Sequence, residues 1–284
     1  NCEAPGNRLM TFTESYVHTG YIALNVAEWP VPSSGTSPML LIHGYGSNWH
    51  TWGRVTEKLA QEFHLFAVDL RGMGRSGRVC KNSSRQTWAD DAVPLIEKIT
   101  GQPLVLVGHS LGGWVTAAVA AQQPELVSKA VLVEPYSGSH SEVRKRERAH
   151  RQERQARREQ LIRSAITPSD LVPAVRAEYA EASEDSIERL ARMWFELDPV
   201  LETVISEPPD GDETFADMFS AIQCPTLIIQ GATDKGGILS DEESDRIAGL
   251  IPDSRILRWP RVGHSPHIAR NHDFIRTLKR FHAE

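Results

Sequence analysis

The sequence predicts an α/β fold with a mostly parallel, doubly wound sheet of eight strands and a helical segment inserted into it. Three observations support this prediction. Short apolar runs of strand length alternate with segments of helical period along most of the chain. That alternation stops between residues 137 and 222, where no buried strand is evident. The length of 284 residues and the hydrophobic content of 40% suit one large globular domain that carries an insertion.

The predicted elements follow one another with little ambiguity in type. Alternating polar and apolar residues from about 11 to 27 predict a β-hairpin at a sheet edge. Continuous apolar runs predict strands that are covered on both faces, at residues 39–43, 63–69, 105–108, 128–134, 225–231 and 255–259. Segments of helical period predict helices at residues 52–62, 88–99 (bent at Pro94), 114–122, 240–251 and 268–281.

The insertion sets the predicted domain organisation. We expect residues 1–136 and 223–284 to form the core domain, and residues 137–222 to form a helical cap over the carboxyl ends of the strands. The first cap helix, 142–159, carries eight Lys or Arg residues and four Glu. Such a stripe could bind an anionic partner, but a solvated face with ion pairs four residues apart is the favoured interpretation.

Composition narrows the function classes. The formal net charge of −6 argues against a nucleic-acid partner, whose phosphates favour a basic surface. No apolar run is long enough to cross a bilayer, and no signal peptide is visible. We therefore expect a cytoplasmic protein without a membrane partner, either monomeric or homodimeric. The alternative that a leader peptide was removed from the chain stays open. Cys2, Cys80 and Cys224 are scattered, without the spacing of metal ligands, and no metal site or cofactor is expected.

The segment Gly108-His109-Ser110-Leu111-Gly112 carries the strongest signal for chemistry. It lies between an apolar strand and an Ala-rich helix, which is the context of the G-x-S-x-G nucleophile elbow. The elbow holds its central residue in a strained conformation and crowds the turn, so small residues are needed on both sides. The sequence therefore predicts that Ser110 is a catalytic nucleophile.

The loop His43-Gly44-Tyr45-Gly46 follows another predicted strand directly. Glycines let backbone N–H groups turn toward one point, which is how an oxyanion hole is built, and the expected donors are the N–H groups of Tyr45 and Leu111. His43 is expected to anchor this loop rather than to transfer protons. Gly44 and Trp49 are candidate substrate contacts, although large aromatic residues such as Trp49 serve equally well in packing.

Further candidate substrate contacts lie in the predicted cap: Tyr179, Met193 and Trp194. Packing of the cap helices accounts for each of these side chains equally well. After the strand at 63–69, the glycine-rich turn 69–77 matches neither a dinucleotide fingerprint nor a phosphate loop. We interpret it as a tight loop that Asp69 and Arg71 brace.

A serine nucleophile needs a base and an acid that orients the base. His264 follows the last predicted strand, beside Gly263, and is the predicted base, whereas His267, His272 and His282 are expected at the surface. Two carboxylates follow strands and could be the acid: Glu134 and Asp234.

Together these motifs resemble the α/β-hydrolase superfamily over nearly the whole chain: His43-Gly44, the turn from Asp69 to Ser76, the elbow, and Gly263-His264. The resemblance implies an α/β-hydrolase fold. Most members carry the acid where Asp234 lies, while haloalkane dehalogenases and zearalenone lactonases carry it where Glu134 lies, 24 residues after Ser110. The loop 231–240 is similar to that of macrolide-esterase-like and lactonase-like members, so we favour Glu134 and keep Asp234 as the alternative.

The resemblance implies a capped serine hydrolase that cleaves a small-molecule carboxylic ester or lactone, macrocyclic lactones included, through an acyl-enzyme. A serine at position 110 disfavours the dehalogenase and epoxide hydrolase chemistries, which use an aspartate there. Two alternatives remain open. One is cofactor-free perhydrolase or carbon–carbon bond hydrolase chemistry at the same triad. The other is a receptor-like relative that binds a ligand without turning it over.

Overall fold

A computed structural model describes residues 11–30, 33, 35–79, 84–137, 142–201 and 212–284. The structure does not describe residues 1–10 or two parts of the predicted cap, 138–141 and 202–211. Cys2 and Cys80 also lie outside the described residues. Cys224 is buried. No helix in the described ranges is long and apolar enough to cross a membrane.

The core of the fold is one eight-stranded sheet, as predicted. Its order is β1-β2-β4-β3-β5-β6-β7-β8, antiparallel at the β1–β2 and β2–β4 pairs and parallel elsewhere. The strands are β1 Thr13–His18, β2 Ala23–Trp29, β3 Pro38–Ile42, β4 His64–Val68, β5 Leu104–His109, β6 Val127–Val133, β7 Thr226–Gly231 and β8 Ser254–Trp259.

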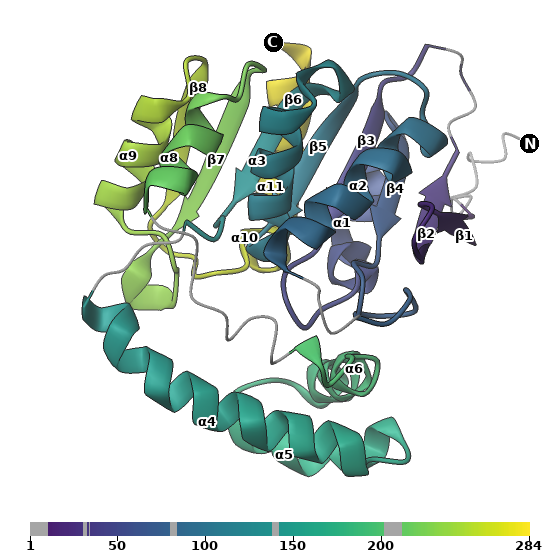
Figure 1. The fold of residues 1–284 in the computed structure, drawn as a ribbon, viewed down its shortest axis with the longest axis vertical. Helices are drawn as coiled ribbons and strands as arrows, with labels where there is room; N and C mark the ends of the chain where they lie inside the picture. Colours follow the sequence, from purple (N-terminus) through teal and green to yellow (C-terminus); the bar gives the residue numbers. More distant parts are fainter. Residues whose placement is uncertain (1–10, 31–32, 34, 80–83, 138–141, 202–211) are drawn as a thin grey trace, which may run out of the picture.

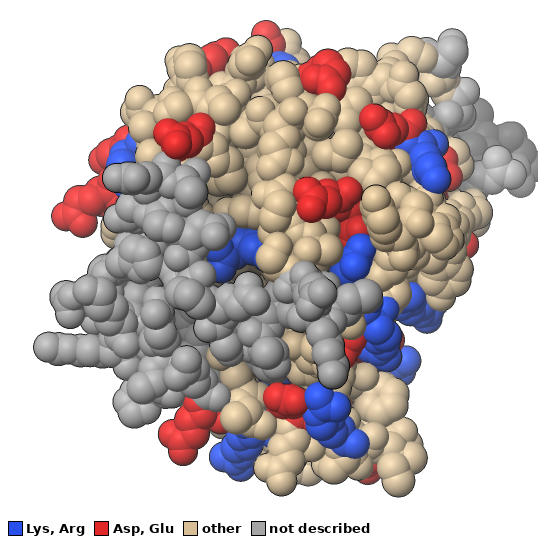
Figure 2. Space-filling model, in the orientation of Figure 1, with Lys and Arg blue, Asp and Glu red and all other residues tan. Residues whose placement is uncertain are grey.

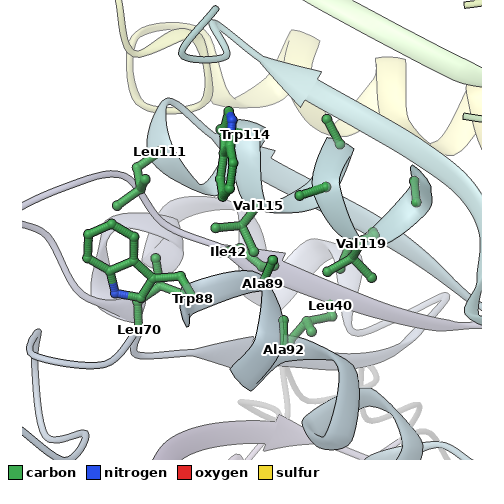
Figure 3. Packing of buried hydrophobic residues seen from close by; sticks show 14 of the residues in the cluster. Leu40, Ile42, Leu70, Trp88, Ala89, Ala92, Leu111, Trp114, Val115 and Val119 are labelled. Carbon is green, nitrogen blue, oxygen red and sulfur yellow. The ribbon is translucent and has the colours of Figure 1, made fainter. Parts of the chain in front are cut away.

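Helices cover both faces of this sheet (Figure 1), because successive side chains of a strand point to opposite faces. Leu40 and Ile42 of β3 belong to the core on the side of α2 and α3, whereas Met39 and Leu41 belong to the core on the side of α1 and α11. Figure 3 shows Trp88 and Ala89 of α2 packing with Val115 and Val119 of α3 in the first of these cores.

The helices agree with the predicted ones in type and differ mainly at their ends. They are α1 Gly53–Leu59, α2 Arg85–Ile99, α3 Leu111–Gln122, α4 Glu142–Ser164, α5 Val172–Glu178, α6 Glu184–Phe195, α8 Asp212–Ser220, α9 Asp241–Leu250, α10 Pro266–Ala269 and α11 Asn271–Ala283. Helix α2 begins three residues before the predicted start because Ser84 and Thr87 form a capping box. Pro94 lies inside α2, which is continuous in the structure.

The glycine-rich turn after β4 is braced as predicted. The Asp69 carboxylate accepts hydrogen bonds from the backbone N–H groups of Trp49 (2.7 Å) and Arg75 (3.0 Å). Arg71 forms a bidentate ion pair with Asp91 of α2, in which Nε–Oδ2 is 2.6 Å and Nη2–Oδ1 is 2.5 Å. The buried turn is thereby tied both to the loop after β3 and to α2.

The inserted segment between β6 and β7 divides into two parts. Helices α4, α5 and α6 lie below the carboxyl ends of the strands (Figure 1), and α5 and α6 share a small core with the preceding turn: Leu171, Val175, Ile187, Ala191 and Trp194. Helix α8 instead contacts α3 and α9, and its Phe215 and Phe219 belong to the large core on the α2 and α3 side. We therefore propose that the cap ends before Asp212 and not at residue 222, because α8 packs as a layer helix of the sheet.

Specific hydrogen bonds fix the inserted segment to the turns of the core. The Asp198 N–H donates to the Gly72 carbonyl (2.7 Å), and the Asp198 carboxylate accepts from the Val79 N–H (2.8 Å). The Asn48 amide donates to Glu196 Oε2 (2.8 Å). On the face shown in Figure 2, acidic and basic side chains of the described residues are interspersed. This face shows no continuous basic surface among those residues.

Candidate active site

Ser110 occupies a sharp turn between β5 and α3. Its backbone has φ 53° and ψ −113°, a conformation that residues other than glycine rarely adopt. The turn is crowded, as predicted: a Cβ on Gly108 would lie 1.9 Å from the Gly112 carbonyl oxygen, and one on Gly112 would lie 2.2 Å from the Ile42 carbonyl oxygen. Only glycine fits at these two positions, so the elbow geometry follows directly from the sequence motif.

The loop after β3 lies against the elbow. A Cβ on Gly44 would lie 3.1 Å from the Ser110 Cβ, which brings Tyr45 and its N–H to the same region. Leu111 is the first residue of α3, so its N–H is outside the hydrogen-bond ladder of that helix. The loop that carries Tyr45 thus lies next to the turn that carries Ser110 and Leu111, and the roles of Tyr45 and Leu111 as oxyanion donors remain predictions.

His43 anchors this loop. It is completely buried, and its Nε2 accepts a hydrogen bond from the Leu70 N–H (3.0 Å). Its Nδ1 must then carry the proton, and it lies 2.7 Å from the Gly44 carbonyl oxygen. Burial lowers the pKa of His43, which favours the neutral ring that this bonding requires.

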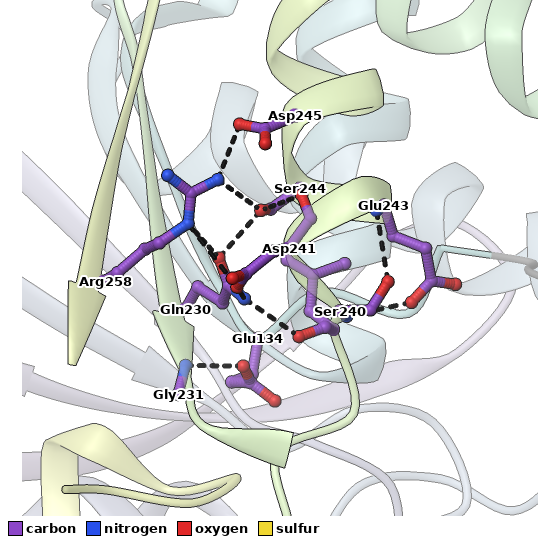
Figure 4. Close-up of polar contacts among 10 residues, drawn as sticks. Glu134, Gln230, Gly231, Ser240, Asp241, Glu243, Ser244, Asp245 and Arg258 are labelled. Carbon is purple, nitrogen blue, oxygen red and sulfur yellow. Dashed lines mark hydrogen bonds and ion pairs between the residues drawn. The ribbon is translucent and has the colours of Figure 1, made fainter. Parts of the chain in front are cut away.

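Glu134 lies at the carboxyl end of β6 and is completely buried. Its backbone φ is 46°, the second positive φ of a residue other than glycine among the described residues. Backbone N–H groups donate to both carboxylate oxygens: Gly231 to Oε1 (2.6 Å, Figure 4) and Ile238 to Oε2 (2.6 Å). Glu134 Oε2 also lies 3.3 Å from Nδ1 of His264.

Asp234 is placed differently. Its side chain is 72% exposed, on a 3-10 turn after β7, and its Oδ2 lies 3.7 Å from the Lys235 ammonium. Within the described ranges, no hydrogen bond or ion pair joins Asp234 to His264. Of the two carboxylates considered for the acid, Glu134 contacts the histidine and Asp234 points to solvent.

His264 reaches the site because the loops after β7 and β8 approach each other closely. A Cβ on Gly263 would lie 2.0 Å from the Lys235 carbonyl oxygen, and one on Gly231 would lie 2.3 Å from the Gly263 carbonyl oxygen. The His264 carbonyl oxygen is itself held by His109 Nε2 at 2.7 Å. The three residues predicted to form the triad, Ser110, His264 and Glu134, therefore follow or end β5, β8 and β6, as expected for a site in an open α/β sheet.

Comparison with known proteins agrees with this architecture. The sequence profile of the alpha/beta hydrolase family matches residues 39–277. The chain belongs to this family. The match runs from β3 through α11 and includes the elbow, Glu134 and His264, so the protein is a hydrolase and the superfamily resemblance is confirmed.

Individual relatives of this hydrolase share the fold at low sequence identity. The (E)-2-((N-methylformamido)methylene)succinate hydrolase of Acinetobacter baylyi is 27% identical over 201 residues, which are 69% of this chain and 72% of that protein. A structure of E-2-(acetamidomethylene)succinate hydrolase matches with a TM-score of 0.75 and 21% identity, over 96% of this chain and 100% of the other. The enol-lactonase of Burkholderia xenovorans LB400 has a TM-score of 0.74 and 18% identity, over 95% and 100%.

Other relatives match over a shorter stretch. Three uncharacterized mycobacterial proteins are 41% identical to the hydrolase over 101 residues, which cover 35% of this chain and 30% of theirs. The chain thus spans about a third of the length of these relatives.

A polar network that the sequence analysis missed supports the Glu134 contact. Gln230, near the end of β7, donates to the Leu239 carbonyl (3.2 Å) and to Asp241 Oδ1 (2.6 Å). Its Oε1 accepts from Ser244 (2.7 Å) and from Arg258 Nε (3.0 Å), as Figure 4 shows. This network fixes the loop whose Ile238 N–H donates to Glu134. The only sequence signal was an amide side chain inside an otherwise apolar run.

His267 corrects one of the sequence predictions. We expected it at the surface, but it is buried, and burial together with the neighbouring His264 lowers its pKa to about 3. Its ring packs on Trp52 at 4.4 Å between centroids, and its Nε2 lies 3.4 Å from Thr51 Oγ1. The short helix α10 turns this side chain inward, against residues more than 200 positions earlier.

Of the candidate substrate contacts, Trp49 packs in the core, and the other four remain open. Trp49 packs in the core against Trp29, with centroids 5.4 Å apart, and is 3% exposed, so its packing interpretation is correct. Trp194 is buried in the cap core, and Tyr179 is partly exposed after α5. Met193 Sδ accepts from Ser47 Oγ at 3.9 Å, which places it against the loop after β3. Gly44, Tyr179, Met193 and Trp194 remain predictions.

Arg158 of α4 connects the inserted segment to the loop after β3. Its guanidinium carbon lies 5.4 Å from the ring centroids of both Tyr45 and Trp194, within the range of a cation–π contact. A positive charge therefore lies beside the loop that carries the expected oxyanion donor. In the part of the chain that the structure describes, no cluster of three His, Cys, Asp or Glu side chains could hold a metal ion.

The close approach at Gly263 makes a testable prediction. In the Gly263→Ala variant, the added Cβ would displace the loop after β8, so we expect a stability loss of about 1–3 kcal/mol and a loss of turnover of about 100-fold from misplacement of His264. Thermal melting and ester kinetics measure both. Gly249→Ala in α9 is the matched control, because nothing lies within 4 Å of its Cβ. Normal melting and turnover of Gly263→Ala would contradict the proposed role of this approach.

Proposed function

We propose that this hydrolase cleaves a carboxylic ester or lactone through an acyl-enzyme on Ser110. The observation that carries the proposal is the strained elbow, which exposes the serine at the N-terminus of α3 beside the loop 43–46. A hydroxyl held in this way, next to preorganised N–H donors and a histidine, is the arrangement used for acyl transfer.

In the proposed mechanism, the Ser110 hydroxyl attacks the carbonyl carbon while His264 takes its proton. Because His264 Nδ1 faces Glu134, Nε2 is the nitrogen that acts as the base. The N–H groups of Tyr45 and Leu111 bind the oxyanion. The tetrahedral intermediate collapses, His264 returns the proton to the leaving alkoxide, and the acyl group stays on Ser110. A water molecule, deprotonated by His264, then attacks the acyl-enzyme. His264 returns this proton to the Ser110 oxygen as the acid leaves, which regenerates the free enzyme. No step uses a metal or organic cofactor.

We assign the acid to Glu134 and not to Asp234. The Glu134 carboxylate is held rigidly by two backbone donors and faces the histidine, so it can orient the ring and stabilise the positive charge that develops on it. The exposed Asp234 carboxylate is paired with Lys235, and its charge is screened by solvent. We also propose that residues from α4 to α6 form the cap over this site.

Carboxylate-bearing esters are the substrate class to test first. The guanidinium of Arg158 lies against the Tyr45 ring. Two of the relatives named above act, by their names, on substituted succinates, which are dicarboxylates. An Arg side chain beside the site would attract and orient such a group.

The test compares the monoanionic 4-nitrophenyl glutarate monoester with its neutral methyl ester. We expect hydrolysis with a burst of nitrophenol that reports acyl-enzyme formation, and a higher kcat/KM for the anion. Arg158→Met should reduce that preference by about tenfold, the contribution of one charge-assisted hydrogen bond. The exposed neighbour Arg157→Met is the matched control and should leave it unchanged.

The parts of this proposal fail separately. A wild-type enzyme that shows no preference for the anion would overturn the substrate class only. An anion preference that Arg158→Met leaves unchanged would overturn the role of Arg158. If the folded protein turned over neither these esters nor a panel of small and macrocyclic lactones, esterase function would be rejected in favour of carbon–carbon bond hydrolysis, perhydrolysis or ligand binding.

A further inference from the structure

The side chain of His109 connects three parts of the candidate active site. His109 ends β5 and directly precedes Ser110. Its ring is buried, and its Nε2 lies 2.7 Å from the backbone carbonyl oxygen of His264. On its other side, a Cβ on Gly44 would lie 3.0 Å from His109 Nδ1. One imidazole therefore contacts the loop of the proposed base and the loop of the proposed oxyanion hole.

The contact with His264 determines the protonation of this ring. A carbonyl oxygen only accepts hydrogen bonds, so His109 Nε2 must carry the proton. The ring is neutral when Nδ1 is unprotonated. Burial is the main cause that lowers the pKa of His109 well below its usual value, and the neighbouring His267 and His264 lower that pKa further. The ring can thus donate this bond without adding a charge beside the base.

The surroundings of His109 keep it in place. Its ring centroid lies 4.6 Å from that of His264 and 4.6 Å from that of His267. The ring of His267 is in turn packed on Trp52. The groups that face His109 are therefore His264, His267, His43 and the backbone of Gly44. The nitrogen that donates to the His264 carbonyl has little freedom to move.

We propose that His109 is a positioning residue for His264: its Nε2–H, bonded to the His264 carbonyl, sets where the imidazole of His264 stands relative to Ser110. This inference rests on the proposed function. His109 touches no reacting atom, so it acts through the backbone of the base and not in a chemical step. Loss of the bond would let the loop after β8 move, and small displacements of a base are costly to proton transfer.

The test compares His109→Leu, which removes the donor, with His109→Gln, whose amide keeps one. We expect His109→Leu to lower kcat for ester hydrolysis by about 10- to 100-fold with KM nearly unchanged. The rate at which a fluorophosphonate modifies Ser110 should fall by the same factor, because it also depends on the base. His109→Gln should restore both rates to within about threefold of the wild type.

His267→Phe separates positioning from packing. His267 contacts the same ring but makes no hydrogen bond to the His264 carbonyl, so this variant should keep its kcat even where its melting temperature falls. All rates are measured well below the melting temperatures, and His109→Met replaces His109→Leu if the latter does not fold.

The results can overturn the proposal in two ways. A kcat of His109→Leu or His109→Met near the wild-type value would show that the bond has no positioning role. Equal losses in His109→Gln and His109→Leu, with both folded, would show that volume and not the donor matters. The proposed function fails by a different result, namely a wild-type protein that neither reacts with the fluorophosphonate nor hydrolyses any ester.

Discussion

Replacing Ser110 by alanine should reduce ester hydrolysis by about 10⁶-fold, the loss that removal of a serine nucleophile causes in a triad enzyme. The fold should be unaffected, because no hydrogen bond found among the described residues uses the Ser110 hydroxyl. Alanine keeps the strained backbone at φ 53°, so no gain in stability is expected either. Steady-state kinetics and thermal melting of the purified variant measure the two effects.

Ser110→Gly provides the control for strain. Glycine adopts positive φ without steric cost, so this variant should be as inactive as Ser110→Ala but more stable than it, by about 1 kcal/mol. A loss of turnover in both variants that is far smaller than the expected 10⁶-fold would indicate a different nucleophile, because removal of the true nucleophile leaves only the small residual rate that binding and the oxyanion hole support.

Loss of the Glu134 carboxylate should give the second-largest effect. Glu134→Gln is expected to lower kcat by about 10³- to 10⁴-fold, as in triads whose acid is replaced by its amide, because the histidine loses its orienting partner. Glu134→Ala should also be destabilised, since the buried N–H groups of Gly231 and Ile238 would lose their acceptor at about 1–3 kcal/mol each. Kinetics of acylation and denaturant unfolding report the two consequences.

Asp234→Asn is the matched comparison. Its side chain is mostly exposed, so we expect kcat within about twofold of the wild type and unchanged stability, as for other surface substitutions. A larger loss of acylation rate in Asp234→Asn than in Glu134→Gln would assign the acid to Asp234 instead.

Local patterns in the sequence were sufficient to predict the sheet and the elbow. The apolar runs of β3 to β7 follow from burial on both faces, and Gly108 and Gly112 are required by atoms only a few residues away or in the next strand. These features depend on periodicity and steric size, which can be read along the chain.

The choice between Glu134 and Asp234 depended on information that does not lie near either residue. Both follow strands, so their spacing alone leaves both open. The direction of Glu134 is set by backbone donors at the end of β7 and in the loop after it. Gln230 and Arg258 hold that loop in place from two different strands. No short-range pattern encodes that arrangement.

The buried position of His267, and our proposal that α8 does not belong to the cap, have the same explanation. The ring of His267 is buried against Trp52, more than 200 residues earlier in the chain, so a position beside the final helix could not reveal it. The sequence predicts α8 as part of the cap because no strand lies between β6 and this helix, yet the phenylalanines of α8 belong to the core that contains α3. In both cases, contacts between residues far apart in the sequence determine where the residue or helix packs.

The central claim is that Ser110 is the nucleophile that carries the acyl group. The most direct measurement is reaction of the wild-type protein with a fluorophosphonate, followed by proteolysis and mass spectrometry. The proposed mechanism predicts one phosphonyl group per chain, on the peptide that contains Ser110, and none on the Ser110→Ala variant. A label on another residue, or an unlabelled protein that still hydrolyses esters, would contradict it.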